Sequence, residues 1–290
     1  MKIINKYRII ISQTLKDFRY NCWHYKQRAN ITPEIKFAEL RKKCHMLDKG
    51  LNNVNFEKGH SLSIYKEAVI LRDELKNKYV NDRCFDWINE IIGRFENAQI
   101  TGKVLLENQD FDDYSDAQIS EYVRFIESRT SCRNFIQKEI PHEVIRKMSE
   151  VAIMAPNGCC QQSVRFFFTQ DQEKIKAAVP NIVGITNFTN IQCLVCVASE
   201  CSCYILDDKY LQYVDASLAA GNLLLGARLY GVYGTMCNFF HANKSQILKC
   251  KEIFGLSNTQ NIVVFIAMGY PVAIPEKPTR RNIEVFYKEI

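Results

Sequence analysis

The sequence predicts an α+β fold that follows an all-helical N-terminal region. Residues 1 to about 100 hold four segments whose apolar residues recur at helical spacing. From residue 141 onward, helical patterns alternate with short apolar runs that are typical of strands. No G-x-G-x-x-G follows a strand pattern, which argues against a doubly wound sheet with a dinucleotide site. We therefore expect a helical extension of unknown role over residues 1–110 and an α+β domain over residues 111–290.

Composition places the chain among ordinary folded proteins. Its 290 residues are 47% hydrophobic and 24% charged. No run of about 18 apolar residues is present, so we expect no membrane-spanning helix. The basic start at residues 1–8 lacks an apolar core, so we expect no signal peptide. Twelve cysteines in such a chain indicate free thiols in a reducing compartment, and we expect a cytoplasmic protein.

The positive charge is concentrated at the start of the chain. Residues 1–60 carry 13 Lys/Arg against 5 Asp/Glu, a balance of +8 within a total of +6. Such a segment could meet nucleic acid, a membrane surface or another protein. Its lysines are dispersed rather than clustered, which favours a solvated helical face, and we expect no nucleic-acid partner.

The four N-terminal helices are expected at residues 1–28, 33–50, 63–79 and 82–96. Thr32-Pro33 is typical of a helix start, because proline fits the first turn. Residues 51–60 are rich in Asn and Gly and predict a loop. Residues 108–116 carry four aspartates and predict a linker; they lack the glycine and distal glutamate of a calcium loop. Ser115 is a plausible cap for a helix that ends at Ser128.

In the α+β region, the spacing of apolar residues predicts helices at residues 141–155, 173–179, 213–230 and 247–254. Strands are expected at residues 164–169, 193–199 and 261–268, the second of them apolar throughout and therefore buried on both faces. Small residues along 213–230 indicate a crowded core or a subunit seam.

Residues 128–135, S-R-T-S-C-R-N-F, are the first candidate site. Arg129 and Arg133 supply two guanidinium forks and Ser131 a hydroxyl, the groups that hold a phosphate. An exposed basic loop is the simpler alternative. Cys193, Cys196, Cys201 and Cys203 suggest zinc, but residues three apart on a strand face opposite sides, so we expect buried thiols and no metal. Cys159 and Cys160 lie in a polar loop without a histidine at a spacing that indicates catalysis.

Four motifs follow one another in a recognisable order: R-T-S-C-R-N-F at 129–135, A-P-N-G-C-C-Q-Q at 155–162, D-A-S-L-A-A-G-N-L-L-L-G-A-R-L-Y-G-V-Y-G-T at 215–235, and G-Y-P at 269–271 before Arg280-Arg281. Together they resemble the nitroreductase family of flavin enzymes over about residues 115–290. The resemblance implies a sandwich of a mostly antiparallel sheet and flanking helices, an obligate homodimer, and FMN bound in two sites at the dimer interface.

The resemblance also implies residue roles. The first flavin-binding motif corresponds to Arg129, Thr130, Ser131 and Arg133, and Arg280 to the arginine that closes on the same phosphate, with Arg281 as the substitute. The segment lining the flavin corresponds to Pro156, Asn157, Gly158, Cys160 and Gln162. The turn whose backbone approaches flavin N5 corresponds to Gly234, Thr235, Met236 and Cys237. The chain departs from the family loop A-P-S-G-x-N-x-Q-P-W at Asn157, Cys160, Ser163 and Val164, and from the turn G-L-G-T at residues 231–234.

The function implied is an FMN-dependent oxidoreductase. NADH or NADPH would deliver a hydride to flavin N5, and a small-molecule acceptor, nitroaromatic or quinone-like, would then replace it. No catalytic side chain is expected, because the flavin carries the chemistry. Two alternatives stay open: a specialised biosynthetic flavin enzyme whose extension selects a partner or covers the site, and a degenerate scaffold or partner-binding protein with little turnover.

Overall fold

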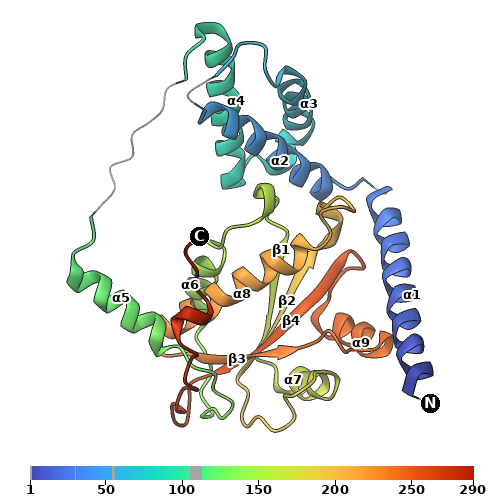
Figure 1. Ribbon diagram of the computed structural model, residues 1–290, viewed down its shortest axis with the longest axis vertical. Coiled ribbons are helices and arrows are strands. Elements are labelled where there is room, and N and C mark those ends of the chain that lie inside the picture. Colours follow the sequence, from blue (N-terminus) through green and yellow to red (C-terminus); the bar gives the residue numbers. More distant parts are fainter. Residues whose placement is uncertain (1, 30, 54–55, 105–112) are drawn as a thin grey trace.

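A four-stranded antiparallel sheet lies at the centre of the protein, with helices on both faces and a helical region beside it (Figure 1). The computed structural model describes residues 2–29, 31–53, 56–104 and 113–290. Within these ranges, none of the helices is long and apolar enough to cross a membrane. The expected α+β fold with an N-terminal helical region is confirmed.

The helical region consists of α1 (Lys2–Ala29), α2 (Pro33–Leu51), α3 (Leu62–Tyr79) and α4 (Arg83–Thr101). Thr32 caps α2 by accepting a hydrogen bond from the Ile35 amide, and Pro33 opens its first turn as expected. Helix α4 runs on past the expected end to Gly102, whose left-handed backbone terminates it. Helices α2, α3 and α4 share a core of their own, whose large buried residues include Phe37, Leu40, Leu47, Phe85, Ile88, Ile91, Ile92 and Phe95.

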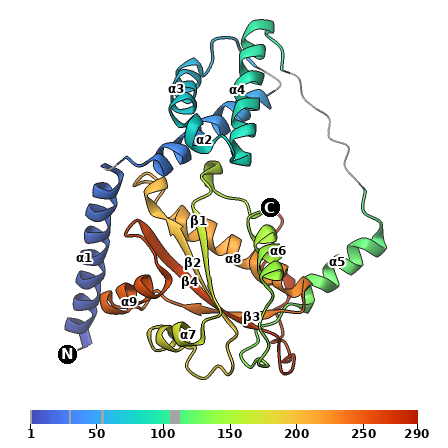
Figure 2. The ribbon, with the colours of Figure 1, turned by 180° about the vertical axis from the view of Figure 1, so that it is seen from behind.

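Helix α5 (Asp116–Ser128) stands off from the sheet in both views (Figures 1 and 2). Ser115 and Gln118 form a reciprocal capping box at its start, which confirms the expected cap. None of its residues is buried, although its apolar residues fall on one side. Residues 108–112 of the expected linker lie outside the described residues.

The sheet contains β1 (Val164–Thr169), β2 (Cys193–Glu200), β3 (Tyr233–Asn238) and β4 (Gln260–Gly269), in the order β1-β2-β4-β3. Every residue of β2 is buried, as its apolar run predicts. One correction concerns residues 234–237. They were expected to form a turn, but they belong to the edge strand β3, which pairs with β4 from Tyr233 opposite Gly269 to Asn238 opposite Val264.

Two hydrophobic cores fill the two faces of the sheet. Helices α6 (His142–Ala152) and α8 (Leu211–Leu229) cover one face, and α7 (Gln172–Ala178) and α9 (Lys244–Phe254) cover the other. Cys193 belongs to the first core and Cys196 to the second, so their expected divergence is confirmed. Gly226 allows α6 to approach α8 closely, because a Cβ there would lie 2.9 Å from the Met148 carbonyl oxygen. The helix predicted to sit in a crowded core does so.

The helical region is joined to the sheet domain at η3 (Cys201–Cys203), the 3₁₀ turn after β2. His24 Nε2 bonds the Cys201 carbonyl at 3.0 Å, and Arg28 donates to the carbonyls of Ser202 and Cys203 at 3.1 and 3.2 Å. From α2, Ala38 packs on Cys203. Helices α1 and α2 therefore contribute to the same packed body as the sheet.

Candidate functional site

The arginine motif is tied to the edge strand β3. Ser131 forms a parallel bridge with Gly234, and Thr235 Oγ1 donates a hydrogen bond to the Cys132 carbonyl at 2.7 Å. Phe135, fully buried, forms an antiparallel bridge with Pro271 just after β4. These contacts bring the first and third predicted flavin segments side by side.

Both arginines of the motif are available to an anion. In the described part of the chain, neither Arg129 nor Arg133 forms a hydrogen bond or ion pair through its guanidinium group; that of Arg133 lies 5.9 Å from the ring centre of Phe188. Thr130 between them is buried and Ser131 partly so. Arg133 is exposed and Arg129 is partly exposed, so a pair of cations anchored by a buried neighbour presents its forks without rearranging the backbone.

Strand β3 supplies a backbone surface beside the arginines. It is an edge strand, so the outward backbone groups that the Ser131 bridge leaves free can bind a ligand. A Cβ on Gly234 would lie 3.0 Å from the Ala267 carbonyl oxygen, so a larger residue would require the neighbouring atoms to shift by a few tenths of an ångström. Met236 is exposed, and burial raises the pKa of the Cys237 thiol to about 11. Cys237 is thus a neutral core group and offers no thiolate.

The C-terminal tail passes the same place. Lys277 donates a hydrogen bond to the Glu127 carbonyl, two residues before Arg129. Arg280 and Arg281 follow in the exposed tail, with no side-chain partner among the described residues. The two arginines thus lie three and four positions beyond a residue that contacts the end of α5, where the resemblance implies a phosphate.

The second predicted segment, residues 156–162, is organised around a buried carboxylate. The Gly158 amide donates to both oxygens of Asp215 at 3.0 and 3.1 Å, and Tyr204 donates to Asp215 Oδ2 at 2.7 Å. A Cβ on Gly158 would lie 2.8 Å from Leu211 Cδ1. Asp215, near the start of α8, therefore fixes the loop through the backbone amide of Gly158.

This loop is also held in an uncommon conformation. Cys159, Cys160 and Gln162 all adopt positive φ values, 51°, 55° and 48°. Each is a left-handed conformation that costs a non-glycine residue on the order of 1 kcal/mol. Asn157 Oδ1 accepts a hydrogen bond from the Gln162 amide at 3.0 Å and so bridges the strained turn. A strained backbone conformation is stable only when the surrounding structure holds it in place. Such conformations are common at ligand sites.

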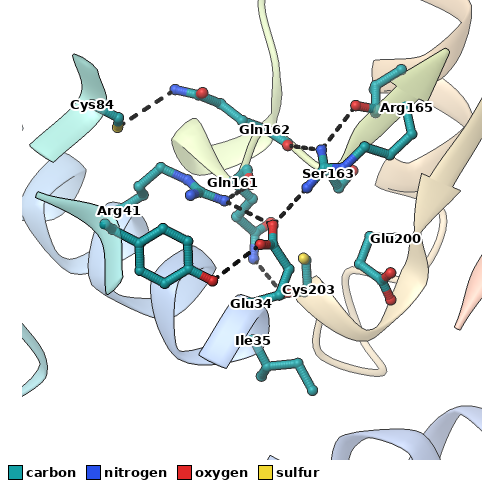
Figure 3. A network of polar contacts seen from close by, with 12 residues as sticks. Glu34, Ile35, Arg41, Cys84, Gln161, Gln162, Ser163, Arg165, Glu200 and Cys203 are labelled. Atoms are coloured by element: carbon teal, nitrogen blue, oxygen red, sulfur yellow. Dashed lines mark hydrogen bonds and ion pairs between the residues drawn. The ribbon is translucent and has the colours of Figure 1, made fainter. Parts of the chain in front are cut away.

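The surroundings that hold the loop come from the helical region (Figure 3). Arg41 of α2 donates to the Gln161 carbonyl at 2.7 Å, and its guanidinium lies 4.4 Å from the ring centre of Phe37. Glu34 accepts from Arg165 at 2.6 Å. The sequence motifs did not identify Glu34 and Arg41. Both lie in a helical segment with many other charged residues, and nothing in that local pattern indicates a contact with a distant loop.

Three of the predicted loop residues border a cavity of about 180 Å³: Pro156, Asn157 and Gln162. The rest of its lining is mainly apolar and comes from α6, β1 and α8, with Val164, Phe166 and Ala219 among the contributors. A small apolar recess beside polar loop groups can accept the edge of a planar ring.

The fifteen predicted residues form two groups within one chain. The arginine motif, residues 234–237 and the tail gather at the β3 edge of the sheet, whereas the loop leads into β1 at the opposite edge. Three strand spacings separate these edges, about 14 Å. The loop also lies at the start of α8, while Gly234 lies beside Leu224, more than two turns further along that helix.

Comparison with known proteins supports the resemblance to the nitroreductase family. Residues 126–199, which include both the arginine motif and the loop, match the sequence model of the Nitroreductase family. Over this stretch the chain is similar to the Nitroreductase family, and the sheet domain that contains it is called the nitroreductase domain below. An Archaeoglobus fulgidus protein named as an NADH dehydrogenase/NAD(P)H nitroreductase is 28% identical over 157 residues, 53% of this chain and 87% of the relative.

Solved structures show the same fold. A Bacteroides thetaiotaomicron protein named as an NADH dehydrogenase/NAD(P)H nitroreductase matches with a TM-score of 0.52 at 21% identity, covering 58% of this chain and 96% of that one. A nitroreductase-like protein from Streptococcus mutans matches with a TM-score of 0.52 at 17% identity, covering 59% and 99%. The likeness in fold thus extends over somewhat more than half of the chain.

Proposed function

We propose that the protein is an FMN-dependent NAD(P)H oxidoreductase that reduces a small-molecule acceptor. The observation that carries the proposal is the bridge of Ser131 to Gly234, which sets two arginines without a partner among the described residues beside the outer edge of the sheet. A phosphate fits the guanidinium forks and the Ser131 hydroxyl, and a flavin ring fits against the backbone of β3. The residues present therefore suit FMN.

Each group of residues has a distinct task in this proposal. Arg129, Arg133 and the Ser131 hydroxyl bind the phosphate, and Arg280 of the tail closes over it. The β3 backbone from Gly234 to Cys237 orients the ring by hydrogen bonds, and the loop with Asn157, Cys160 and Gln162 covers its edge and excludes water. When bound, FMN supplies two-electron transfer between NADH or NADPH and the acceptor, so no side chain needs to act as acid or base.

We further propose that the active form is a homodimer, because the two groups lie at opposite edges of the sheet. A second copy would bring its own loop to the arginine motif of the first. Exposed apolar side chains that a second copy could cover lie on α5, just after α6, on α8 and in the tail: Ile119, Tyr122, Val123, Ile126, Ile153, Met154, Val214, Leu218, Ile283, Val285, Phe286 and Tyr287. Apolar patches of this extent mark interaction sites. Sedimentation at micromolar concentration should give twice the monomer mass of 33.7 kDa.

The absorption spectrum of the purified protein tests the cofactor proposal. We expect visible flavin bands, and we expect Arg129→Ala with Arg133→Ala to remove most of the bound flavin. Lys49→Ala, an exposed cation on α2, is the matched control and should retain it. A colourless wild-type protein whose melting temperature does not change when FMN is added would overturn the proposal and favour the scaffold alternative.

The acceptor class is tested with the flavin-loaded protein. Consumption of NADH and NADPH is followed with a nitroaromatic, a quinone and no acceptor. We expect acceptor-dependent oxidation of at least one of the two coenzymes. Flavin that stays bound but never turns over with either coenzyme would contradict the oxidoreductase proposal while leaving the binding site intact.

A further inference from the structure

A second cavity, of about 740 Å³, lies between α1, the start of α8 and the start of α9. Its lining comes from three separate segments, residues 13–23, 209–213 and 240–247. None of these segments overlaps the stretch that matches the family model. In Figures 1 and 2, α1 lies beside α9 at the side of the sheet away from α5. The cavity exists only because α1 packs against the nitroreductase domain.

The walls of this cavity carry an excess of positive charge. Lys16 and Arg19 project from α1, Lys209 precedes α8, and Lys244 opens α9, whereas Asp17 is the one carboxylate of the lining. Lys209 is partly occupied, since it donates to Asn21 Oδ1 at 2.6 Å. In the described part of the chain, the side chains of Lys16, Arg19 and Lys244 have no hydrogen-bond or ion-pair partner. Like charges around one cavity repel one another and destabilise the folded state. A bound anion would reduce this repulsion.

The start of α9 strengthens the field in the same place. Its first turn contains no acidic residue and begins with Lys244, the opposite of the charge that stabilises a helix N-terminus. Asn243 and Gln246 form a capping box that satisfies the third amide of the helix. The other first-turn amides have no partner within the helix, so the start of α9 can bind an anion.

Aromatic rings form the remaining walls. Tyr20 and Trp23 of α1 lie with ring centres 5.6 Å apart, and Tyr213 of α8 lies 5.6 Å from Phe240. Tyr210 and Phe240 are 63% and 65% exposed, unusual for large rings that border a cavity. Exposed rings beside cations offer stacking surfaces for a planar ligand.

The wall formed by α1 is fixed to the domain. Gln212 donates to the Tyr20 hydroxyl at 2.5 Å, and the His24 and Arg28 contacts to η3 follow one turn and two turns later. The cations and rings of α1 are therefore held in position, so that a ligand need not order the helix. Pre-formed sites of 300–1,000 Å³ are the usual size for small-molecule ligands.

We propose that this cavity binds a nucleotide, a ligand that joins a planar base to one or two phosphates. The cations and the α9 N-terminus take the phosphate, and the rings of Trp23, Tyr210 and Phe240 take the base. The site is separate from the flavin site and does not depend on it. It gives the helical region a binding function that the nitroreductase domain alone lacks.

Tryptophan fluorescence tests the proposal directly. The chain has two tryptophans, Trp23 in the cavity and Trp87 on α4, so Trp87→Phe leaves a single reporter at the site. This full-length variant is titrated with AMP, adenosine and inorganic phosphate at low salt. We expect saturable quenching by AMP, with adenosine and phosphate binding at least tenfold more weakly, and a loss of affinity as salt is raised.

Charge-neutral variants locate the binding. In the Trp87→Phe background, Arg19→Gln and Lys244→Gln should each weaken AMP binding about tenfold or more. Lys26→Gln on α1 and Lys249→Gln on α9 remove the same charge from the same helices outside the cavity, and should change binding less than twofold. All of these are exposed positions, so the variants should fold; their melting temperatures confirm it.

Several outcomes would overturn the proposal. They are no saturable change with AMP, equal loss in the test and control variants, or inorganic phosphate binding as tightly as AMP. Tight binding of a single-stranded RNA oligomer without measurable AMP binding would assign the surface to RNA instead. Loss of AMP binding in Arg129→Ala, or release of flavin by AMP, would place the signal at the flavin site. If the protein does not bind flavin, the AMP titration can still be carried out. Failure of the flavin proposal and failure of the nucleotide proposal are therefore distinguishable.

Discussion

Single residues decide the shape of the loop at 156–162. Cys160 stands where the nitroreductase resemblance has an asparagine, and its backbone is left-handed with φ 55°. Asparagine tolerates that conformation better than cysteine, because its short polar side chain can bond locally. The Gln162 side chain donates to Cys160 Sγ at 3.4 Å and to Cys84 Sγ at 3.9 Å, so sulfur already serves as an acceptor here.

We therefore predict that Cys160→Asn stabilises the protein by up to about 1 kcal/mol and increases flavin retention. Cys159→Asn is the matched control, because Cys159 has nearly the same φ of 51° but does not occupy the family asparagine position. Thermal melts should rise for both variants. The flavin fraction left after gel filtration should rise for Cys160→Asn alone, and an equal rise in both would contradict the assigned role.

Arg41 is the residue whose loss should cost most. It is 3% exposed and donates to the Gln161 carbonyl, so its removal leaves a buried acceptor without a partner. We predict that Arg41→Met lowers the free energy of unfolding by about 2–4 kcal/mol. Arg94→Met on α4 removes a surface pair with Glu90 and should cost less than about 1 kcal/mol. Urea unfolding measures both, and similar losses would mean that Arg41 does not hold the loop.

At the scale of elements, local patterns predicted most helices and the buried strands because their own residues specify them. The uniform apolar run of β2 and the capping residues Thr32 and Ser115 are local signals, and the structure confirms them. Strand β3 was missed because Gly234 and its polar neighbours favour a turn, and only pairing with β4 makes them a strand. The contact of Arg41 was missed for the same reason: local sequence does not report on a partner 120 positions away.

Helix α1 should respond to pH through His24. Its side chain is fully buried, and this burial lowers the pKa of the imidazole below its usual value, with the Arg28 and Lys209 charges adding to the effect and the Cys201 carbonyl opposing it. The unfolded state then binds more protons than the folded state, so the stabilisation is complete above about pH 6.5 and is lost as pH falls below it.

We predict a melting temperature that drops between pH 7.5 and pH 5.5, with α1 amides exchanging hydrogen faster at the lower pH. His24→Gln should reduce this pH dependence, because glutamine has no proton to gain. His142→Gln, at an exposed position on α6, should preserve it. Equal pH dependence in His24→Gln and the wild type would place the effect on other groups.

At the scale of the whole molecule, the helical region is a structural partner of the nitroreductase domain. Helices α2, α3 and α4 have a core of their own. Helices α1 and α2 nevertheless donate to the carbonyls of four residues of the domain, Gln161, Cys201, Ser202 and Cys203. A domain boundary drawn from composition could not reveal these contacts, because they join residues more than 100 positions apart.

Removal of residues 1–110 should therefore destabilise the remaining domain. Loss of the hydrogen bonds to these four carbonyls alone, at about 1 kcal/mol each, is equivalent to roughly 4 kcal/mol. For a domain of this size that lowers the melting temperature by roughly 8–16 °C. The loop at 156–162 would lose Arg41, so flavin retention should fall with stability. Removal of residues 1–12 is the control, because the described contacts of α1 with the domain begin beyond them. Calorimetry of both truncations separates the outcomes: an unchanged melting temperature after removal of residues 1–110 would make the helical region an independent attachment.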